Sequence, residues 1–173
     1  MSGKTRPAAR DGGMDTPQHP DSAQARLFAY FQDVVSRYSP IKHFQIGYPD
    51  EQGGAGNTPY PQVFLESAME LSEKQPGLCA FQVSLYVLDM PAGHGRHAGT
   101  RNEPEILART GGYVEELLEI LRLEEVLTDV ALNSSLSLTD YGRDKAAGWH
   151  PEISFTFPMA VDRAALRSRY TPA

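Results

Sequence analysis

Alternating apolar residues in three stretches of this 173-residue chain constrain its fold more than any other feature. Residues 80–89 (AFQVSLYVLD), 130–139 and 150–159 each carry apolar side chains at most alternate positions. Successive side chains of a β-strand point to opposite faces, so a period of two predicts strands with one apolar face. The expected apolar faces comprise Phe81, Val83, Leu85 and Val87; Val130, Leu132, Leu136 and Leu138; and Ile153, Phe155, Phe157 and Met159. The last two strands are predicted to form a hairpin around a polar loop at 140–149.

Two amphipathic helices supply a layer that can cover those apolar faces. The first is predicted over 22–38, with Asp21 or Ser22 as its N-cap. The second is predicted over 103–122, with Asn102 as its N-cap. Apolar residues recur at helical spacing in both, namely Leu27, Phe28, Phe31, Val34, Val35 and Tyr38, then Ile106, Leu107, Val114, Leu117, Leu118 and Leu121.

Shorter strands are predicted at 41–48 and 61–66, whereas the segments 50–60, 67–79 and 90–101 have the composition of loops. This order of elements predicts an α+β fold. We expect a single, mainly antiparallel sheet of about five strands, with two principal helices packed on one face.

The expected domain organisation is simple. Residues 1–21 contain almost no large apolar side chain and are predicted to form a flexible N-terminal arm. Residues 22–173 are predicted to form a single α+β domain. Inside the second helix, the pair Gly111-Gly112 lowers helix propensity and predicts either a kink or a close approach by another backbone.

Charge is concentrated in one segment. The net charge of −6 argues against a protein that coats nucleic acid. Residues 102–129 contain eight acidic and two basic residues, so this segment accounts for the whole net charge. Such a segment is either a solvated helix face or an acidic surface that repels nucleic acid and meets a basic partner.

The sequence predicts no catalytic, cofactor-binding or metal-binding residues. His94 and His97 lie in a glycine-rich loop without the further ligands that a zinc site needs. The glycines at 53–56 are not followed by the Lys-Ser/Thr of a phosphate-binding loop. Cys79, the only cysteine, is interpreted as a small core residue. His150 is interpreted as half of an aromatic pair with the adjacent tryptophan.

The order of elements and several local sequences resemble those of phage tail terminator and neck proteins. The proline-led strand YPQVFLE precedes the long strand FQVSLYVLD, as in the sheet core of that group. The helix ILARTGGYVEELLEIL, followed by a hairpin whose last strand reads GWHPEISFTF, is also similar. The resemblance covers about residues 22–159.

The resemblance implies a structural virion protein of the tail or neck, assembled in the bacterial host cytoplasm, and not an enzyme. Such subunits form a ring, commonly a hexamer, that closes the head-proximal end of the tail and docks it to the neck. The implied partners are other copies of the chain, the tail tube and the head-proximal connector. DNA passes through the ring without sequence-specific recognition, and no cofactor or membrane takes part.

Ring contacts are expected in the segments 47–60, 90–101 and 140–149 and in the arm 1–21. If DNA passes through the ring, a further hypothesis is that Glu115, Glu116 and Glu119 face the lumen or a basic partner.

Two other classes of function stay open. One is another head–tail connector or a general adaptor module. The other is a small enzyme or ligand-binding domain, for which His94, His97 and His150 would form the polar centre.

Overall fold

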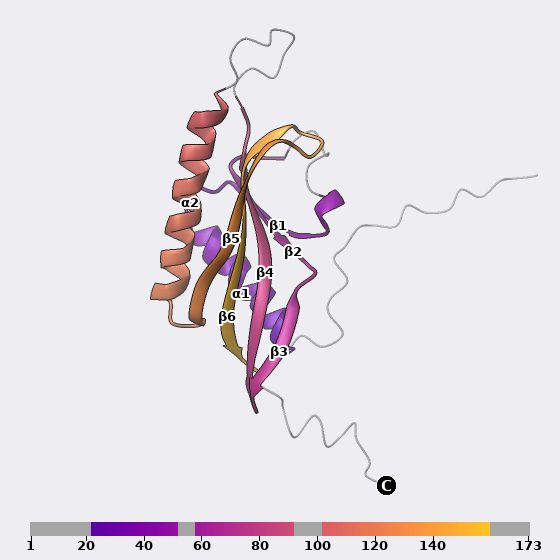
Figure 1. Cartoon of the computed structure of the whole chain (residues 1–173), viewed down its shortest axis with the longest axis vertical. Coiled ribbons are helices and arrows are strands. Elements are labelled where there is room, and N and C mark those ends of the chain that lie inside the picture. Colours follow the sequence, from indigo (N-terminus) through magenta and orange to yellow (C-terminus); the bar gives the residue numbers. More distant parts are fainter. Residues whose placement is uncertain (1–21, 52–57, 92–101, 160–173) are drawn as a thin grey trace, which may run out of the picture.

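Two α-helices and six strands make up the described part of the chain, which comprises residues 22–51, 58–91 and 102–159 of the computed structural model (Figure 1). A 3₁₀ turn, η1 (Pro49–Glu51), follows the first strand. The bounds of the other elements are α1 Ala23–Arg37, β1 His43–Gly47, β2 Gln62–Glu66, β3 Glu70–Gln75, β4 Leu78–Asp89, α2 Glu103–Leu123, β5 Thr128–Tyr141 and β6 Ala146–Pro158.

Both helices lie within about a residue of their predicted bounds, because their amphipathic patterns are long and regular. Ser22 caps α1 as predicted, since its side-chain oxygen accepts a hydrogen bond from the backbone N–H of Ala25 at 3.1 Å. Asn102 occupies the N-cap position of α2 but makes no capping hydrogen bond through its side chain.

The strands form one mixed sheet in the order β1-β2-β4-β6-β5, and β3 pairs with β4 beside β2. Four strand pairs are antiparallel and only the β1–β2 pair is parallel. The α+β fold is therefore confirmed, with six strands in place of about five. The additional strand, β3, lies in the segment 67–79 that was expected to be a loop. All six of its residues are exposed, so no apolar alternation marks it in the sequence.

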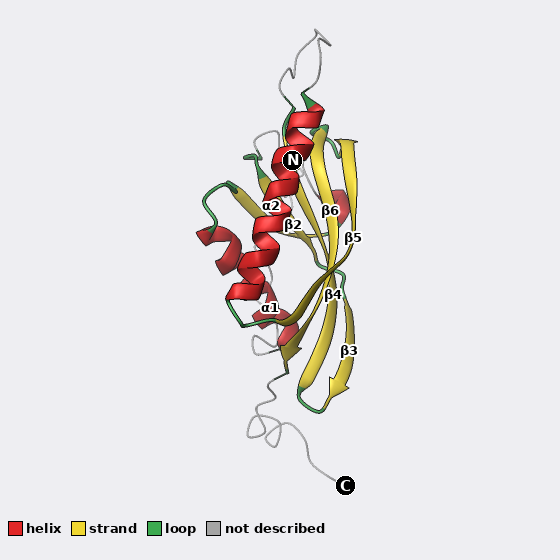
Figure 2. Cartoon of the chain, turned by 60° about the vertical axis from the view of Figure 1, so that its left-hand side comes forward, coloured by secondary structure: helices red, strands yellow, loops and turns green. Residues whose placement is uncertain are grey.

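Both helices pack on one face of the sheet, as Figure 2 shows. Phe31 of α1 and Leu117 of α2 are buried there against Phe81 and Val83 of β4 and Phe155 of β6. Phe31 and Phe155 have ring centroids 6.0 Å apart. Burial of such large apolar side chains is the main force that holds the helical layer on the sheet. We call the face of the sheet that is turned away from the helices the distal face.

The apolar residues of β5 do not lie on one face, contrary to the prediction. The pairing register between β5 and β6 shifts between Leu132 and Ser134, so Leu132 pairs with Ile153 but Leu136 pairs with His150. Ile153 belongs to the helix-side core. A bulge of this kind adds one residue to a strand and so reverses the faces that follow it. The four leucine and valine positions are therefore divided between the two faces.

The predicted ten-residue loop at 140–149 is also wrong. β5 continues to Tyr141 and β6 begins at Ala146, so the connection is a four-residue turn. The end of this hairpin, orange in Figure 1, bends away from α2. It reaches the start of β2, where the Tyr60 hydroxyl donates to the Asp144 carboxylate at 2.9 Å. Ala146 and Leu138 pack there against Phe64.

The glycine pair of α2 makes neither a kink nor a backbone contact. The helix is continuous, and an added Cβ at Gly111 would lie 3.2 Å from Nε1 of the Trp149 side chain. That indole nitrogen donates a hydrogen bond to the carbonyl oxygen of Leu107 at 2.8 Å. Gly111 therefore gives an indole ring access to the helix backbone, whereas an added Cβ at Gly112 would meet nothing within 4 Å.

Candidate functional site

The residues that the sequence singled out for chemistry do not come together. His94, His97 and the glycines at 53–56 lie outside the described residues. Cys79 is only 1% exposed in the helix-side core, which confirms its interpretation as a core residue. His150 lies on the distal face, opposite to its neighbour Trp149, so the two do not form a pair. Among the described residues, no cluster of three or more His, Cys, Asp or Glu side chains could hold a metal ion.

Most of the segments that were expected to make ring contacts also fall outside the described residues. These include all of 1–21, 52–57 within 47–60, and 92–101 within 90–101. The described part of 47–60 is held locally, because the Glu51 carboxylate accepts a hydrogen bond from the Tyr48 backbone at 3.0 Å.

The distal face of the sheet carries neutral and acidic side chains. Register places Glu66 of β2, Gln82 and Ser84 of β4, and Glu152 and Ser154 of β6 on this face. The sequences of β1, β2, β4, β5 and β6 contain no lysine or arginine. The only strand lysine is Lys74 of β3, which lies 3.8 Å from a carboxylate oxygen of Asp129. Apart from this paired lysine, the described strands therefore offer no cation to a polyanion.

An aromatic cluster marks one end of the distal face. The Tyr86 ring stacks on His150 with centroids 4.1 Å apart and on Tyr141 with centroids 5.2 Å apart. Phe64 meets Tyr86 edge-on at 5.9 Å. Such stacking fixes the end of the β5–β6 hairpin against β2 and β4.

His150 is half-buried in this cluster. Its Nε2 atom is buried and has no hydrogen-bond partner among the described residues. Burial lowers the pKa of the imidazole below 6.5, and the nearby Glu66 and Glu152 only partly oppose that effect. A general base must reach the proton that it abstracts, and the burial of Nε2 keeps this atom out of contact with solvent.

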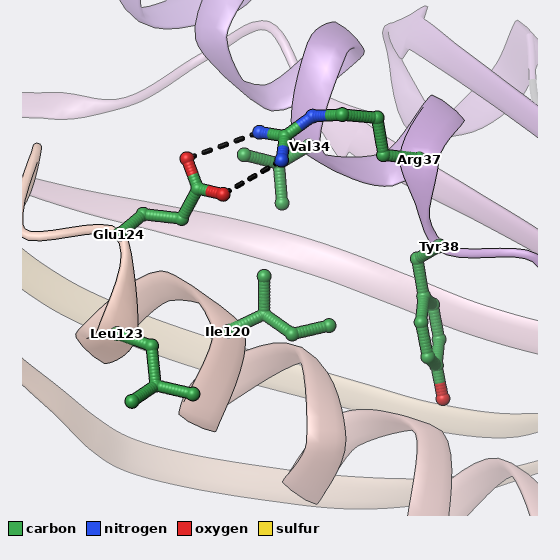
Figure 3. Close-up of a pocket in the computed structure, with 6 residues that line it drawn as sticks. All are labelled: Val34, Arg37, Tyr38, Ile120, Leu123 and Glu124. Carbon is green, nitrogen blue, oxygen red and sulfur yellow. Dashed lines mark hydrogen bonds and ion pairs between the residues drawn. The ribbon is translucent and has the colours of Figure 1, made fainter.

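A pocket of about 320 Å³ lies between the C-terminal ends of the two helices (Figure 3). It is lined by Val34, Arg37 and Tyr38 from α1 and by Ile120, Leu123 and Glu124 from the end of α2. We call this space the interhelical pocket. Its lining combines aliphatic side chains with a pair of opposite charges, so it suits an amphipathic ligand better than a purely polar one.

The charged pair of the interhelical pocket joins the helices. The Arg37 guanidinium donates to both carboxylate oxygens of Glu124, at 2.7 and 3.0 Å, and also donates to Asp33 at 3.0 Å. These hydrogen bonds raise the pKa of Arg37, and the arginine lowers the pKa of Glu124. Arg37 therefore has its charge balanced within the chain.

Two tyrosines of α1 lie beside this pair. The Tyr38 hydroxyl hydrogen-bonds to Glu116, and burial together with this bond raises its pKa. The Tyr30 hydroxyl is buried without a hydrogen-bond partner among the described residues. Burial and the charge of Glu124 raise the pKa of Tyr30 to about 12. A buried hydroxyl without a partner loses its hydration without replacement, which is unfavourable unless another group supplies the bond.

The three glutamates of α2 that were expected to face a lumen lie on the helical layer. Glu116 accepts the hydrogen bond from Tyr38, and Glu119 accepts one from Arg122. Glu115 is exposed. Two members of this cluster thus have partners within the chain, and the lumen hypothesis for them stays a prediction.

Neither the interhelical pocket nor the distal face was expected from the sequence. A signal for the pocket was present, because Tyr30 and Arg37 lie at helical spacing from Val34, at the border of the main apolar stripe. A signal for the distal face was the absence of lysine and arginine from the long alternating stretches. Neither signal could be placed in space before the strand register and the helix packing were known.

Neither described helix is long and apolar enough to cross a membrane. No family model matches the chain, and no curated protein matches it either. The resemblance to tail terminator proteins accordingly remains a prediction.

Proposed function

We propose that this chain is a structural virion protein of the tail terminator class, a subunit that forms a ring at the head-proximal end of a phage tail. The ring would stop the tail tube and dock it to the connector of the head, and DNA would pass through its centre. The proposal rests on the resemblance seen in the sequence, on the charge of the distal face and on the two edges of the sheet.

The charge of the distal face is the main support for the proposal. A lumen that conducts DNA must not retain it, and retention of a polyanion depends on lysine and arginine contacts to phosphates. The distal face has Glu66 and Glu152 among neutral side chains, and its one strand lysine lies close to a carboxylate. We assign this face to the lumen, with the helices on the outside of the ring. Of the two expectations for the glutamates of α2, this assignment keeps the basic partner and gives up the lumen.

The edges of the sheet support a ring. A closed ring needs two different complementary surfaces on each subunit. The sheet has β5 at one end and β1 and β3 at the other. Leu136 of β5 is 65% exposed on the distal face, and Leu71 of β3 is 57% exposed on the helix side, so each edge strand presents an apolar side chain. Subunits placed edge to edge would align their distal faces into one inner wall.

Charge reversal on the distal face tests the proposal. The double variant Glu66→Lys with Glu152→Lys puts two cations per subunit on the wall assigned to the lumen. We expect the assembled ring to gain DNA binding that weakens steeply as salt is raised, measured by fluorescence anisotropy with a short labelled duplex.

The matched control places the same change of charge on the helical layer. Glu115→Lys with Glu119→Lys should give much weaker DNA binding, since these residues would lie outside the ring. Equal DNA binding by the two variants, or binding by the helical variant alone, would contradict the assignment of the lumen to the distal face.

A further inference from the structure

The interhelical pocket carries an excess of negative charge. Residues 33–42, which include the end of α1, and 113–126, which include the end of α2, together contain six acidic and three basic residues. The C-terminal end of a helix adds a partial negative charge, and the ends of both helices line this pocket. The pocket therefore attracts cations and repels anions such as nucleic acid.

Both arginines of these helix ends are already neutralised by carboxylates. Arg37 is held by Asp33 and Glu124. Arg122 forms an ion pair with Glu119. The side chains of Asp33 and Glu119 are more than half exposed, so a further cation can reach their carboxylates. A ligand that brings additional positive charge finds acceptors here, whereas an acidic ligand finds both guanidinium groups already paired.

The pocket also presents apolar surface at its rim. Leu123, which lines the pocket, is 77% exposed, the highest value among the large apolar residues that are described. Val126, in the connection that follows α2, is 41% exposed. Ile120 and Val34 extend the apolar lining into the pocket, beside the ion pair that joins the helices (Figure 3). Covering these side chains removes apolar area from water and so stabilises a complex.

A peptide segment fits these features better than a small molecule does. The pocket volume of about 320 Å³ is at the lower end of the range for small-molecule sites, which is about 300–1,000 Å³. The exposed apolar surface continues along the chain from Leu123 to Val126, which does not line the pocket. A protein partner commonly fills such a pocket with one anchoring side chain and covers the rim with its neighbours.

The described surface of a second copy offers no segment of this chemistry. Apart from Leu123 itself, no large apolar residue exposed in the described part of the chain has a lysine or arginine within two residues of it. These features favour a different protein as the occupant. On the proposed ring the helices lie outside, so the pocket stays open to such a partner after assembly. This location, but not the pocket itself, rests on the proposed function.

We propose that the interhelical pocket binds a basic segment of a partner protein, anchored by one large apolar side chain. The anchor, a leucine or phenylalanine, enters between Val34 and Ile120 and packs on Leu123. Arginines or lysines on either side of the anchor face the carboxylates of Asp33 and Glu119 and the carbonyl groups of the last helical turns. The apolar contact supplies most of the affinity, and the charges exclude acidic segments.

Fluorescence anisotropy with labelled synthetic peptides tests the proposal on the full chain. The first peptide has two leucines flanked by arginines. The second has glutamates in place of the arginines, and the third has serines in place of the leucines. We expect the first peptide to bind about tenfold more tightly than either of the others, with an affinity that falls as salt is raised. Equal affinity for all three peptides, or no saturable binding of the first at millimolar concentration, would overturn the proposal.

Substitutions at the pocket locate the binding of the first peptide. Leu123→Ser removes the exposed apolar contact and should weaken the binding about tenfold. Glu119→Gln combined with Glu124→Gln removes two carboxylates and leaves both arginines without these partners. This double variant should also weaken the binding about tenfold, and the remaining affinity should depend less on salt.

Each variant has a matched control away from the pocket. Leu71→Ser changes an exposed leucine of β3, and Glu66→Gln with Glu105→Gln removes the same charge from the distal face and the first turn of α2. Both controls should bind the first peptide like the natural chain. An equal loss of affinity in a control and in its pocket variant would contradict the assigned site. Thermal unfolding of every variant confirms that folded proteins are compared.

Sedimentation velocity without peptide separates this proposal from the ring. If Leu123→Ser lowers self-association of the chain, a second copy occupies the pocket and the proposal of a different partner is wrong. Specific binding of the first peptide by a chain that stays a monomer would support the pocket and contradict the ring. The two proposals therefore fail separately.

Discussion

At the scale of single residues, the two adjacent glycines of α2 have different roles and give a matched pair of substitutions. Gly112 has no neighbour within 4 Å of an added Cβ, so Gly112→Ala should gain helix propensity and stabilise the fold by about 0.5–1 kcal/mol. Gly111→Ala brings a methyl group to 3.2 Å from the Trp149 indole, which is held by its hydrogen bond to Leu107. That contact should offset the gain in propensity.

Thermal unfolding measures the difference. For a chain of this size, Gly112→Ala should raise Tm by about 1–4 °C, and Gly111→Ala should leave it unchanged or lower it. A larger increase for Gly111→Ala than for Gly112→Ala would mean that the indole does not lie against the helix backbone as described.

The buried imidazole of His150 makes stability depend on pH. Its pKa is lowered in the folded chain, so below about pH 6.5 the unfolded chain binds more protons than the folded chain does. The stabilising contribution of the neutral ring is therefore complete above that pH and is lost as the pH falls through the lowered pKa.

Denaturant titrations between about pH 7 and about pH 5 check this dependence. The His150→Phe variant keeps an aromatic ring on Tyr86 and removes the titrating group. Its free energy of unfolding should fall less steeply with decreasing pH than that of the natural chain. Identical slopes for the two proteins would show that His150 does not titrate differently in the folded state.

At the scale of elements, regular patterns were predictable and interrupted ones were not. Both helices and the buried face of β4 follow from uninterrupted periods, such as Phe81, Val83 and Leu85. β3 was missed because its residues are exposed on both sides. The two faces of β5 were misassigned because a bulge after Leu132 has no marker in the sequence.

The same limits apply to the candidate sites. The interhelical pocket joins residues of α1 to residues more than 80 positions later, as in the Arg37–Glu124 pair. No local sequence pattern specifies such a contact, because the contact depends on how two separate helices pack on one sheet. The distal face likewise becomes visible only when the strand register places Glu66 and Glu152 on one side.

The exposed leucines of the edge strands allow a test of the subunit contact. If Leu136 of β5 and Leu71 of β3 make the contact between subunits, Leu136→Ser and Leu71→Ser should each weaken self-association without lowering Tm, since both side chains are exposed in the single chain. Three register shifts along β5 interrupt its edge, so we expect side-chain contacts and not a continuous added strand.

Leu123→Ser is the control for this pair, because Leu123 is exposed at the interhelical pocket and not at a sheet edge. Sedimentation velocity over a series of concentrations compares the three variants. Weakened association in Leu123→Ser alone would move the subunit contact from the sheet edges to the helical layer.

At the scale of the whole molecule, the helices and the distal face divide the protein into two sides. The helical side contains the larger core, the acidic segment and the interhelical pocket. The sheet side has a wall whose described strands bear a single lysine, close to a carboxylate. This division suits a subunit that turns one side to a DNA-conducting channel and the other to its surroundings.

The mass of the assembled species tests the central claim most directly. A single chain has a mass of 19.1 kDa, and a hexamer would have six times this mass. Native mass spectrometry over rising concentration, with negative-stain electron microscopy of the same samples, should show one closed oligomer in the form of a ring. A chain that stays at the mass of one subunit at every concentration, alone and with isolated tail tubes, would contradict the account.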